Sequence, residues 1–490
     1  MQQASSTPRA PFAPFIEAIQ TDDPLETLRA GLIGEGAQID GPFGPRSLVY
    51  ADYTASGRAL MPVERFILEQ VLPYYANSHT EASWCGGFMT RMRQAARAVV
   101  ARHCGAGPEH ATIFTGAGAT AGINRLVALL GAGPGVRVLL GPYEHHSNIL
   151  PWRESGAEVI ELDEAAEGGP DPVQLARLLA DAKGEVICAL SAASNITGIV
   201  ADVEGLTRQV KTAGARMVWD YAGGAPYLPI SMTPAADAAI DAVVLSPHKF
   251  PGGPGASGVT ILRRDAVRRA TPSWPGGGSV RFVSPEGHDY SDSPEAREEA
   301  GTPDGPGDIR AALVFLVKET IGQERMDRRH RELCARVEDA WRRHPLIELL
   351  GRQRLAQLPI VSLRIRDGAG GFFHQQLVAR MLSDHYGIQA RGGCACAGPY
   401  VHRLLGIDAA QSARLRQAIL SGDELAKPGF VRLNLSALMT DRKVDYILES
   451  LCKLAETAPV LAQDYDCDPG RAIFTARARN HRDSGVAAPV

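Results

Sequence analysis

The 490-residue sequence contains no long apolar run, which limits where the protein can work. No stretch approaches the ~20 consecutive apolar residues of a membrane-spanning helix, so we expect no membrane partner. The opening residues, MQQASSTPRAPFAPF, lack the charged head and apolar core of a secretory signal. These absences predict a cytoplasmic protein.

Cysteine is scarce and the charges nearly balance. The eight cysteines are irregularly spaced, which does not fit a disulfide framework and favours a reducing compartment. The formal net charge is −4, with Lys and Arg scattered along the chain. Because no basic stripe results, we expect no nucleic-acid partner.

What is present is typical of a large globular protein, with 45% hydrophobic and 22% charged residues. The length predicts two or three domains. A single long helix is expected from about residue 308 to residue 341. The predicted divisions are an N-terminal arm (1–45), a large domain (46–307), a helix linker with a small α+β C-terminal domain (308–455) and a peripheral tail (456–490).

Apolar, strand-like runs recur between residues 111 and 262, separated by helical or loop segments. Such repeated strand–helix units predict an α/β domain with a mostly parallel, seven-stranded sheet. Ligands of these sheets bind beyond the carboxyl ends of the strands, where the motifs below lie. The seven runs are Ala111–Phe114, Val136–Leu140, Glu158–Leu162, Val186–Leu190, Arg216–Trp219, Ala242–Leu245 and Val259–Leu262.

Small residues follow the first of these strands and open a helix. Gly118, Ala119 and Thr120 would let backbone N–H groups approach an anion at the positive end of the helix. The pattern predicts a phosphate cradle, although a tight strand–helix turn would need the same small residues. It matches neither the Walker pattern nor the dinucleotide Gly-x-Gly-x-x-Gly.

A histidine pair, His145 and His146, follows the second strand. An imidazole at a sheet edge can stack on a flat ring or move protons near neutral pH. Alternatives are a metal pair, or a helix start capped by Ser147 or Asn148. Adjacent side chains of an extended segment point to opposite sides, which argues against a shared metal.

A carboxylate and a lysine end two successive strands. Asp220 follows an apolar run, where burial of its charge is costly unless it meets a cation, either a protonated ring nitrogen or a structural arginine. Lys249, in Ser246-Pro247-His248-Lys249, would have its pKa lowered by enclosure, as a Schiff-base lysine requires. The alternative is a lysine that merely begins a surface loop.

These motifs occur together in the order cradle, histidine, acid, lysine. Pyridoxal phosphate needs such a set: a phosphate cradle, a stacking ring, an acid that keeps the ring nitrogen protonated, and a lysine that bonds its aldehyde. The sequence therefore predicts pyridoxal 5′-phosphate as the cofactor and no metal.

On these motifs the chain resembles class V aminotransferase-fold proteins, of the cysteine desulfurase and selenocysteine lyase group, over roughly residues 52–454. The resemblance implies the pyridoxal-phosphate-dependent transferase fold, type I. It also implies a homodimer, because Thr302 of the Arg297–Pro303 signature would reach the phosphate of the partner subunit. The implied cofactor contacts are Gly118, Ala119, Thr120, His145 (ring stacking), Asn195 (phenolic oxygen), Asp220 (ring nitrogen), Ser246, His248 and Lys249 (Schiff base).

A second motif concerns the substrate. In Arg391-Gly392-Gly393-Cys394-Ala395-Cys396 an arginine fork suits a substrate carboxylate, and a cysteine follows two flexible glycines. The family pattern implies that Arg391 binds the carboxylate and that Cys396 is the nucleophile. The alternatives are a metal held by Cys394 and Cys396, which lacks a second ligand pair nearby, and a structural, inert cysteine.

The predicted reaction is removal of sulfur from L-cysteine, through a persulfide on Cys396, with release of alanine. Lys249 would move the Cα proton, assisted by Asp220 and His145. Two departures from the family keep alternatives open. Gly223 stands where a glutamine is usual, and residues 398–429 form an insertion that could cover the active site or dock a sulfur-acceptor protein. The alternatives are an aminotransferase, epimerase or lyase without persulfide chemistry, and a non-catalytic cofactor-binding protein.

Overall fold

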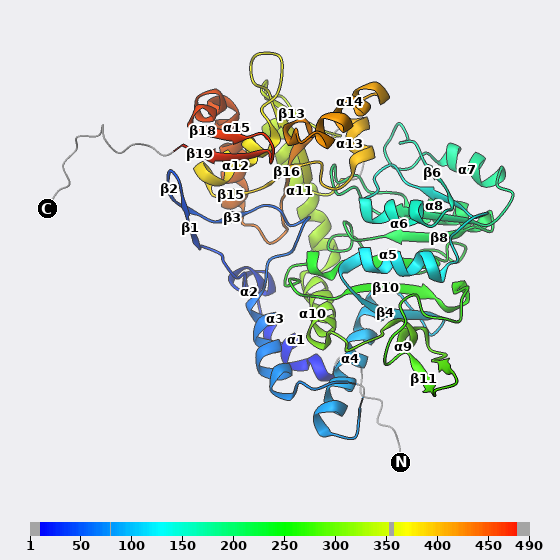
Figure 1. The fold of residues 1–490 in the computed structure, drawn as a ribbon. Coiled ribbons are helices and arrows are strands. Elements are labelled where there is room, and N and C mark those ends of the chain that lie inside the picture. The colour runs from blue at the N-terminus through cyan, green and yellow to red at the C-terminus, as the bar shows by residue number, and fades with distance from the viewer. Residues whose placement is uncertain (1–9, 79, 352–356, 478–490) are drawn as a thin grey trace.

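The centre of the large domain is one seven-stranded sheet with the order β4-β10-β9-β8-β7-β5-β6 (Figure 1). β10 runs antiparallel to β4 and β9, and all other neighbours are parallel. Every predicted apolar run is a strand of this sheet, so the α/β prediction is confirmed. The strands are β4 (His110–Gly116), β5 (Arg137–Leu140), β6 (Glu158–Glu161), β7 (Val186–Ser191), β8 (Arg216–Asp220), β9 (Ala242–Leu245) and β10 (Gly258–Arg263).

The structure is a computed structural model that describes residues 10–78, 80–351 and 357–477. Within these ranges, no helix has the length and apolar character to cross a membrane.

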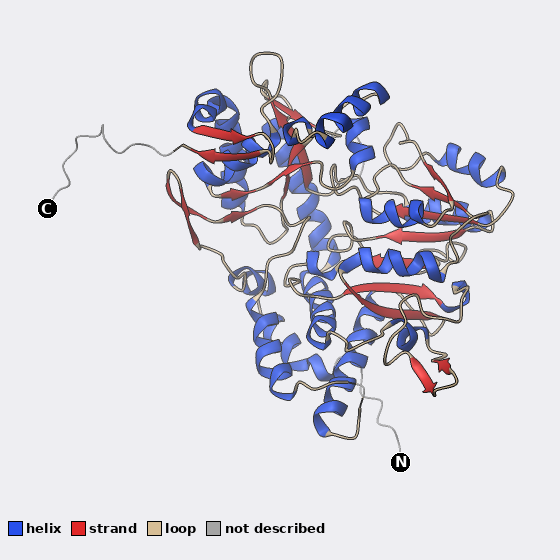
Figure 2. Cartoon of the chain, viewed as in Figure 1, coloured by secondary structure: helices blue, strands red, loops and turns tan. Residues whose placement is uncertain are grey.

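Helices cover both faces of the sheet, which explains why most residues of its strands are buried (Figure 2). On β8, Met217 and Trp219 belong to one apolar core and Val218 to the other, as the two-residue period of a strand requires. The first core includes α4 (Trp84–His103), α7 (Pro172–Ala180), α8 (Val203–Thr212) and α10 (Gly305–Ile321), and the second includes α5 (Gly118–Leu129) and α6 (Leu150–Glu154).

The expected single helix over 308–341 is two helices. α10 ends at Ile321 and α11 (Gln323–Trp341) begins two residues later. Gly322 between them has φ = +82°, outside the right-handed helical region, and glycine adopts such a φ at little cost.

The small domain is a four-stranded sheet with the order β13-β14-β17-β16, covered by helices. β14 and β17 are its two central strands. β17 pairs with β16 in a register that places Arg432 directly opposite Arg391. The elements are β13 (Ile347–Leu349), β14 (Ile360–Ile365), β16 (Arg391–Gly393), β17 (Phe430–Asn434), α12 (Gln375–Tyr386) and α15 (Asp441–Leu461).

The N-terminal region belongs to both domains. β3 (Val49–Tyr50), expected in the large domain, pairs in parallel with β15 (Ile388–Gln389), and Val49 is buried in the small-domain core. Earlier in the expected arm, α1 (Ala13–Ile19) buries Phe15 in the large-domain core. The apolar side chains of this region therefore fasten it to the body of the protein.

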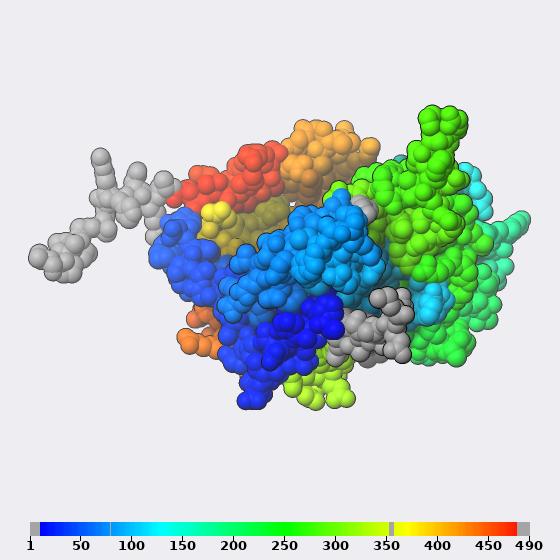
Figure 3. Space-filling view, turned by 90° about the horizontal axis from the view of Figure 1, so that it is seen from below, coloured from blue at the N-terminus to red at the C-terminus, as the bar shows by residue number. Residues whose placement is uncertain are grey.

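Three surface features lie around this body. The insertion folds as α13 (Gly398–Leu404) and α14 (Ala409–Leu420), and α14 has no fully buried residue. The described part of the tail forms a hairpin of β18 (Tyr465–Asp468) and β19 (Ile473–Ala476). The third feature is a hairpin of β11 (Val280–Val283) and β12 (His288–Tyr290), which projects from the large domain (Figures 1 and 3).

Candidate active site

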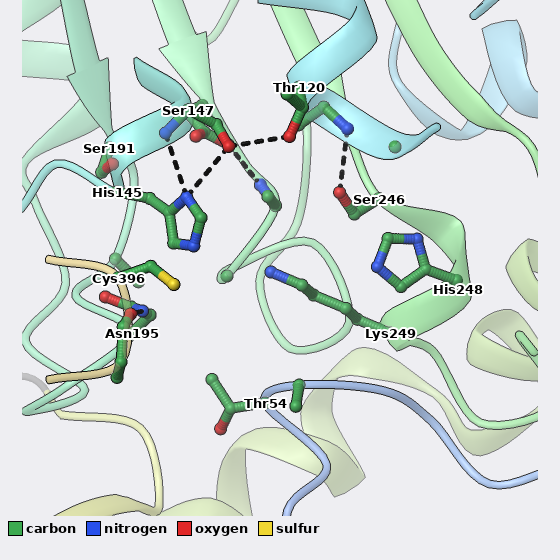
Figure 4. Close-up of a pocket in the computed structure, with 18 of the residues that line it drawn as sticks. Thr54, Thr120, His145, Ser147, Ser191, Asn195, Ser246, His248, Lys249 and Cys396 are labelled. Atoms are coloured by element: carbon green, nitrogen blue, oxygen red, sulfur yellow. Dashed lines mark hydrogen bonds between the residues drawn. The ribbon is translucent and has the colours of Figure 1, made fainter. Parts of the chain in front are cut away.

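A cavity of about 290 Å³ lies at the carboxyl ends of the central strands, where the small domain meets them (Figure 4). The large domain, the segment after β3 and the small domain all contribute walls. Every predicted site residue except Thr302 lines it. These are Gly118, Ala119, Thr120, His145, Asn195, Asp220, Ser246, His248, Lys249, Arg391 and Cys396, joined by Thr54, Gly223 and Arg432 among others.

The start of α5 forms one end of the cavity. The Ala119 N–H donates to Ser246 Oγ at 3.0 Å. Gly118 has φ = +62°, and a Cβ there would lie 2.9 Å from Cε1 of His248, so a side chain would crowd this end. Burial lowers the pKa of His248 to about 4, so the imidazole is neutral near pH 7. A phosphate at this end of the cavity could accept hydrogen bonds from the N-terminus of α5, from Ser246 and from His248.

His145 forms the wall next to this end. Its Nδ1 accepts a hydrogen bond from the Ser147 N–H at 3.1 Å, so Nε2 carries the proton of the neutral ring. Burial, and then the charge of Lys249, lowers the pKa of His145 to about 4. Ser147 is held in turn by Thr120, whose Oγ1 lies 2.7 Å from Ser147 Oγ. The ring therefore has a fixed orientation (Figure 4).

Asp220 supplies a carboxylate at the end of β8. It is almost fully buried and accepts one hydrogen bond, from the Ala222 N–H at 2.7 Å. Burial raises its pKa above the ordinary range. A cationic N–H of a ligand would offset this desolvation and keep the carboxylate ionised.

Lys249 extends its amine into the same cavity. Burial is the main cause that lowers the pKa of Lys249 to about 8, against 10.5 for a free lysine. Asp220 opposes this shift, and Arg432 and Arg391 add to it. A substantial fraction of the amine is therefore neutral and nucleophilic near pH 8, as covalent bonding to an aldehyde requires.

Two arginines face each other at the small-domain wall. Arg432 is buried, and its Nη2 lies 2.8 Å from Asp52 Oδ1. Arg391, directly opposite on β16, is exposed. Like charges at such a position repel, and an anion bound between them would relieve the repulsion. Arg432 is not among the sequence-predicted site residues, although a lone arginine within the largely apolar strand Phe430–Asn434 is a signal that it has a buried partner.

The cavity also holds buried polar atoms without hydrogen-bond partners. Among the described residues these include Oγ1 of Thr54, Oδ1 of Asn195 and Nε of Arg432. Such atoms are costly to bury unless a ligand satisfies them. With the phosphate-binding end, the buried acid, the oriented imidazole and the buried amine, they fit pyridoxal phosphate.

Cys396 lies on a strained turn at the mouth of the cavity. Ala395 and Cys396 have φ values of 49° and 56°, and the Ala397 N–H closes the turn on the Cys394 carbonyl at 3.2 Å. Residues other than glycine in this conformation cost about 1–3 kcal/mol each. The Cys396 thiol is exposed and points into the same space as the Lys249 amine (Figure 4).

Cys394 has a different environment. It is half-buried against the apolar cluster that contains Tyr143, Tyr400 and Phe430. No group of three or more His, Cys, Asp or Glu side chains suited to a metal lies in the described part of the chain.

Gly223 leaves a gap in the wall beside Asn195. A Cβ there would lie 3.4 Å from the Ala193 carbonyl oxygen and 3.8 Å from Cβ of Asn195. Asn195 places a side-chain amide in this wall of the cavity, and its Nδ2 donates a hydrogen bond to the Ala395 carbonyl at 2.9 Å.

Known relatives share both sequence and fold with this chain. The chain is 30% identical to a cysteine desulfurase of Pectobacterium atrosepticum, over 77% of its own length and 89% of the relative's. It is 28% identical to a probable cysteine desulfurase of Pyrococcus abyssi, over 73% and 87% of the two lengths. The solved apo structure of a cysteine desulfurase from Thermococcus onnurineus superposes with a TM-score of 0.72, at 25% identity, covering 88% of this chain and 98% of that one.

A family-level comparison agrees. The pattern of the family described as aminotransferase class-V matches residues 49–447, which span both domains and every wall of the cavity. The chain therefore belongs to the aminotransferase class-V family.

Proposed function

We propose that the protein is a pyridoxal-phosphate-dependent cysteine desulfurase, which removes sulfur from L-cysteine and releases alanine. One observation carries the choice of reaction: the exposed Cys396 thiol shares the mouth of the cavity with the Lys249 amine. An aminotransferase or an epimerase would need the lysine but has no use for a thiol there. The similarity to cysteine desulfurases over most of the chain supports the proposal.

Substrate binding falls to the two arginines. The buried Nε of Arg432 has no protein partner, and Arg391 stands opposite at the open side. A carboxylate between them would receive charge-assisted hydrogen bonds in a partly dry site. We assign Arg432, with Arg391, to the substrate carboxylate.

Pyridoxal phosphate, when bound, supplies an aldehyde for an amine and a ring that withdraws electron density from the substrate's Cα. The residues at the start of α5, with Ser246 and His248, would hold its phosphate. Asp220 would keep a proton on the ring nitrogen, and His145 would pack against the ring. Lys249, whose pKa is lowered to about 8, can carry a proton to and from Cα near neutral pH.

Sulfur transfer falls to Cys396. Its thiolate attacks the substrate sulfur, so that an S–S bond forms as the Cβ–S bond breaks. Overall, one protein thiol and one cysteine yield one protein persulfide and one alanine, and no external oxidant is needed. The persulfide sulfur then leaves to a thiol acceptor, and the insertion beside the mouth is a candidate docking element for an acceptor protein.

We infer a homodimer as the active form. Thr302 is exposed and lies outside the cavity of its own chain, which fits a contact with the cofactor phosphate of the partner subunit. Exposed aromatic side chains give the protein an apolar surface for such an interface. They include Tyr74 and Trp84, and Trp84 stacks on the half-buried Phe88. The eight free cysteines suit a reducing compartment such as the cytoplasm.

The test is release of alanine and sulfide from L-cysteine in the presence of a thiol reductant. We expect equal amounts of both, with loss of sulfide release in Cys396→Ala and near-parent release in Cys394→Ala, the matched control. If Cys396→Ala releases sulfide as fast as the parent, the proposal fails. Conversion of the bound cofactor to its pyridoxamine form by an amino donor would instead indicate an aminotransferase.

A further inference from the structure

The turn that carries Cys396 is held by a residue without a part in the steps above. The backbone N–H of His146 donates to the Cys396 carbonyl at 2.7 Å. Nε2 of the same histidine accepts from the Gly398 N–H at 3.0 Å. One residue of the large domain thus binds the peptide groups on both sides of Ala397.

This turn needs external support because its own conformation is unfavourable. Two successive residues other than glycine have positive φ, and a single hydrogen bond closes the turn from within. Outside it, Asn195 Nδ2 holds the Ala395 carbonyl, and His146 holds the next two peptide groups in line. The contacts fix the backbone of Cys396 and leave its thiol free at the cavity mouth.

The hydrogen bonds also define the form of the imidazole. Because Nε2 accepts from a backbone N–H, it carries no proton, and the neutral ring has its proton on Nδ1. Of the two His146 contacts, only this one depends on the side chain. The backbone contact can persist with any residue except proline at 146, so the role of the imidazole can be tested by itself.

We propose that His146 is the positioning residue for the sulfur-transfer step, acting through its neutral imidazole on the Cys396 turn. This inference rests on the proposed desulfurase function. The neighbouring His145 lines the cavity and would contact the cofactor, whereas His146 holds the turn that carries the nucleophile. The histidine pair therefore serves the two halves of the reaction separately.

The test compares His146→Leu with His146→Gln in the full chain loaded with cofactor. Gln can place an acceptor near the position of Nε2, and Leu cannot. In a single turnover with L-cysteine, we expect persulfide formation on Cys396 to be about tenfold or more slower in His146→Leu, since small displacements of a reacting atom have effects of this size. In the same variant, we expect the initial absorbance change of the cofactor to keep the parent rate. In His146→Gln, we expect the rate of sulfur transfer to be within about threefold of the parent rate.

A second readout does not depend on turnover. Alkylation of Cys396 by iodoacetamide, followed by mass spectrometry without substrate, reports how the thiol is presented. We expect an altered alkylation rate in His146→Leu and the parent alkylation rate in His146→Gln. If His146→Leu forms the persulfide and is alkylated at the parent rates, the proposal is overturned. Equal slowing of persulfide formation in His146→Gln and His146→Leu also overturns it, because that pattern indicates that packing of the ring matters and that the hydrogen bond does not.

Two further outcomes are separable. If the parent forms no persulfide, the proposed function fails, while the alkylation assay still decides the role of His146. If the His146→Leu variant does not fold, Gly398→Ala tests the same hydrogen bond from its donor side, since the added Cβ would lie 3.2 Å from Nε2 of His146. Parent-rate persulfide formation in Gly398→Ala would then overturn the proposal.

Discussion

The two sides of the cavity are built differently. On the large-domain side, Asp220 ends one buried strand of the seven-stranded sheet and Lys249 follows the next, and burial shifts the pKa values of both. On the small-domain side, Cys396 lies exposed on a turn with unfavourable φ values. The first side is fixed by the core of the domain, and the second by a few hydrogen bonds from distant segments.

This difference separates two kinds of chemistry. Proton transfer is aided by groups with shifted pKa values, and burial is the main cause of the shifts at Asp220 and Lys249. Sulfur transfer needs a thiol that meets the substrate and then an external acceptor, which requires exposure. We therefore expect changes on one side to leave the chemistry of the other side intact.

The largest effect is expected from Lys249→Ala. Without the amine, turnover should fall at least about 10³-fold, and borohydride should no longer fix the cofactor to the chain. The alkylation rate of Cys396 should stay at the parent value, because the turn keeps its contacts. Loss of cysteine reactivity in this variant would contradict the separation of the two sides.

Arg432→Ala should have the next largest effect. It removes the proposed carboxylate partner and leaves the Asp52 charge without its cation, which should lower the free energy of unfolding by about 3 kcal/mol. Arg391→Ala, the matched variant on the facing strand, should raise KM for L-cysteine about tenfold and change stability by less than about 1 kcal/mol. Denaturant unfolding and steady-state kinetics measure both. Equal destabilisation by the two variants would contradict the assignment of Arg432 as the buried anchor.

A pH series tests the environment of Lys249. Only the neutral amine bonds an aldehyde, so the rate of covalent attachment in cofactor-free protein should rise with pH. The lowered pKa of Lys249 puts the midpoint of this rise at about 8, not at 10.5. Borohydride trapping at each pH, with mass spectrometry of the Lys249 peptide, measures it. A midpoint near 10 would mean that the amine is solvated.

The smallest effect is expected at Gly223. Its added Cβ would make only ordinary contacts, so Gly223→Ala should change kcat by less than about threefold and stability by less than about 1 kcal/mol. A loss of activity above tenfold would show that the gap beside Asn195 is needed by the cofactor or the substrate.

Much of the large domain could be predicted because its signals are local. The strands contain apolar runs, and a polar residue follows most of these runs, so the strand ends and the order of Asp220 and Lys249 can be taken from the sequence alone. The break between α10 and α11 was missed, although Gly322 within a helical pattern is a recognised signal for one.

The other side depends on pairings between segments far apart in the chain. Arg432 faces Arg391 only because β16 and β17 are neighbours, and His146 reaches Gly398 only because the domains pack together. Neither contact leaves a periodic pattern in the sequence. The positive φ of Cys396 is also unpredictable locally, because residues outside the turn stabilise it.

The most direct test of the proposed function is the mass of the Cys396 peptide after one turnover with L-cysteine in the absence of reductant. We predict the added mass of one sulfur atom on Cys396, one alanine released per modified chain, and no modification in Cys396→Ala. Alanine released at the parent rate with Cys396 unmodified would contradict the account.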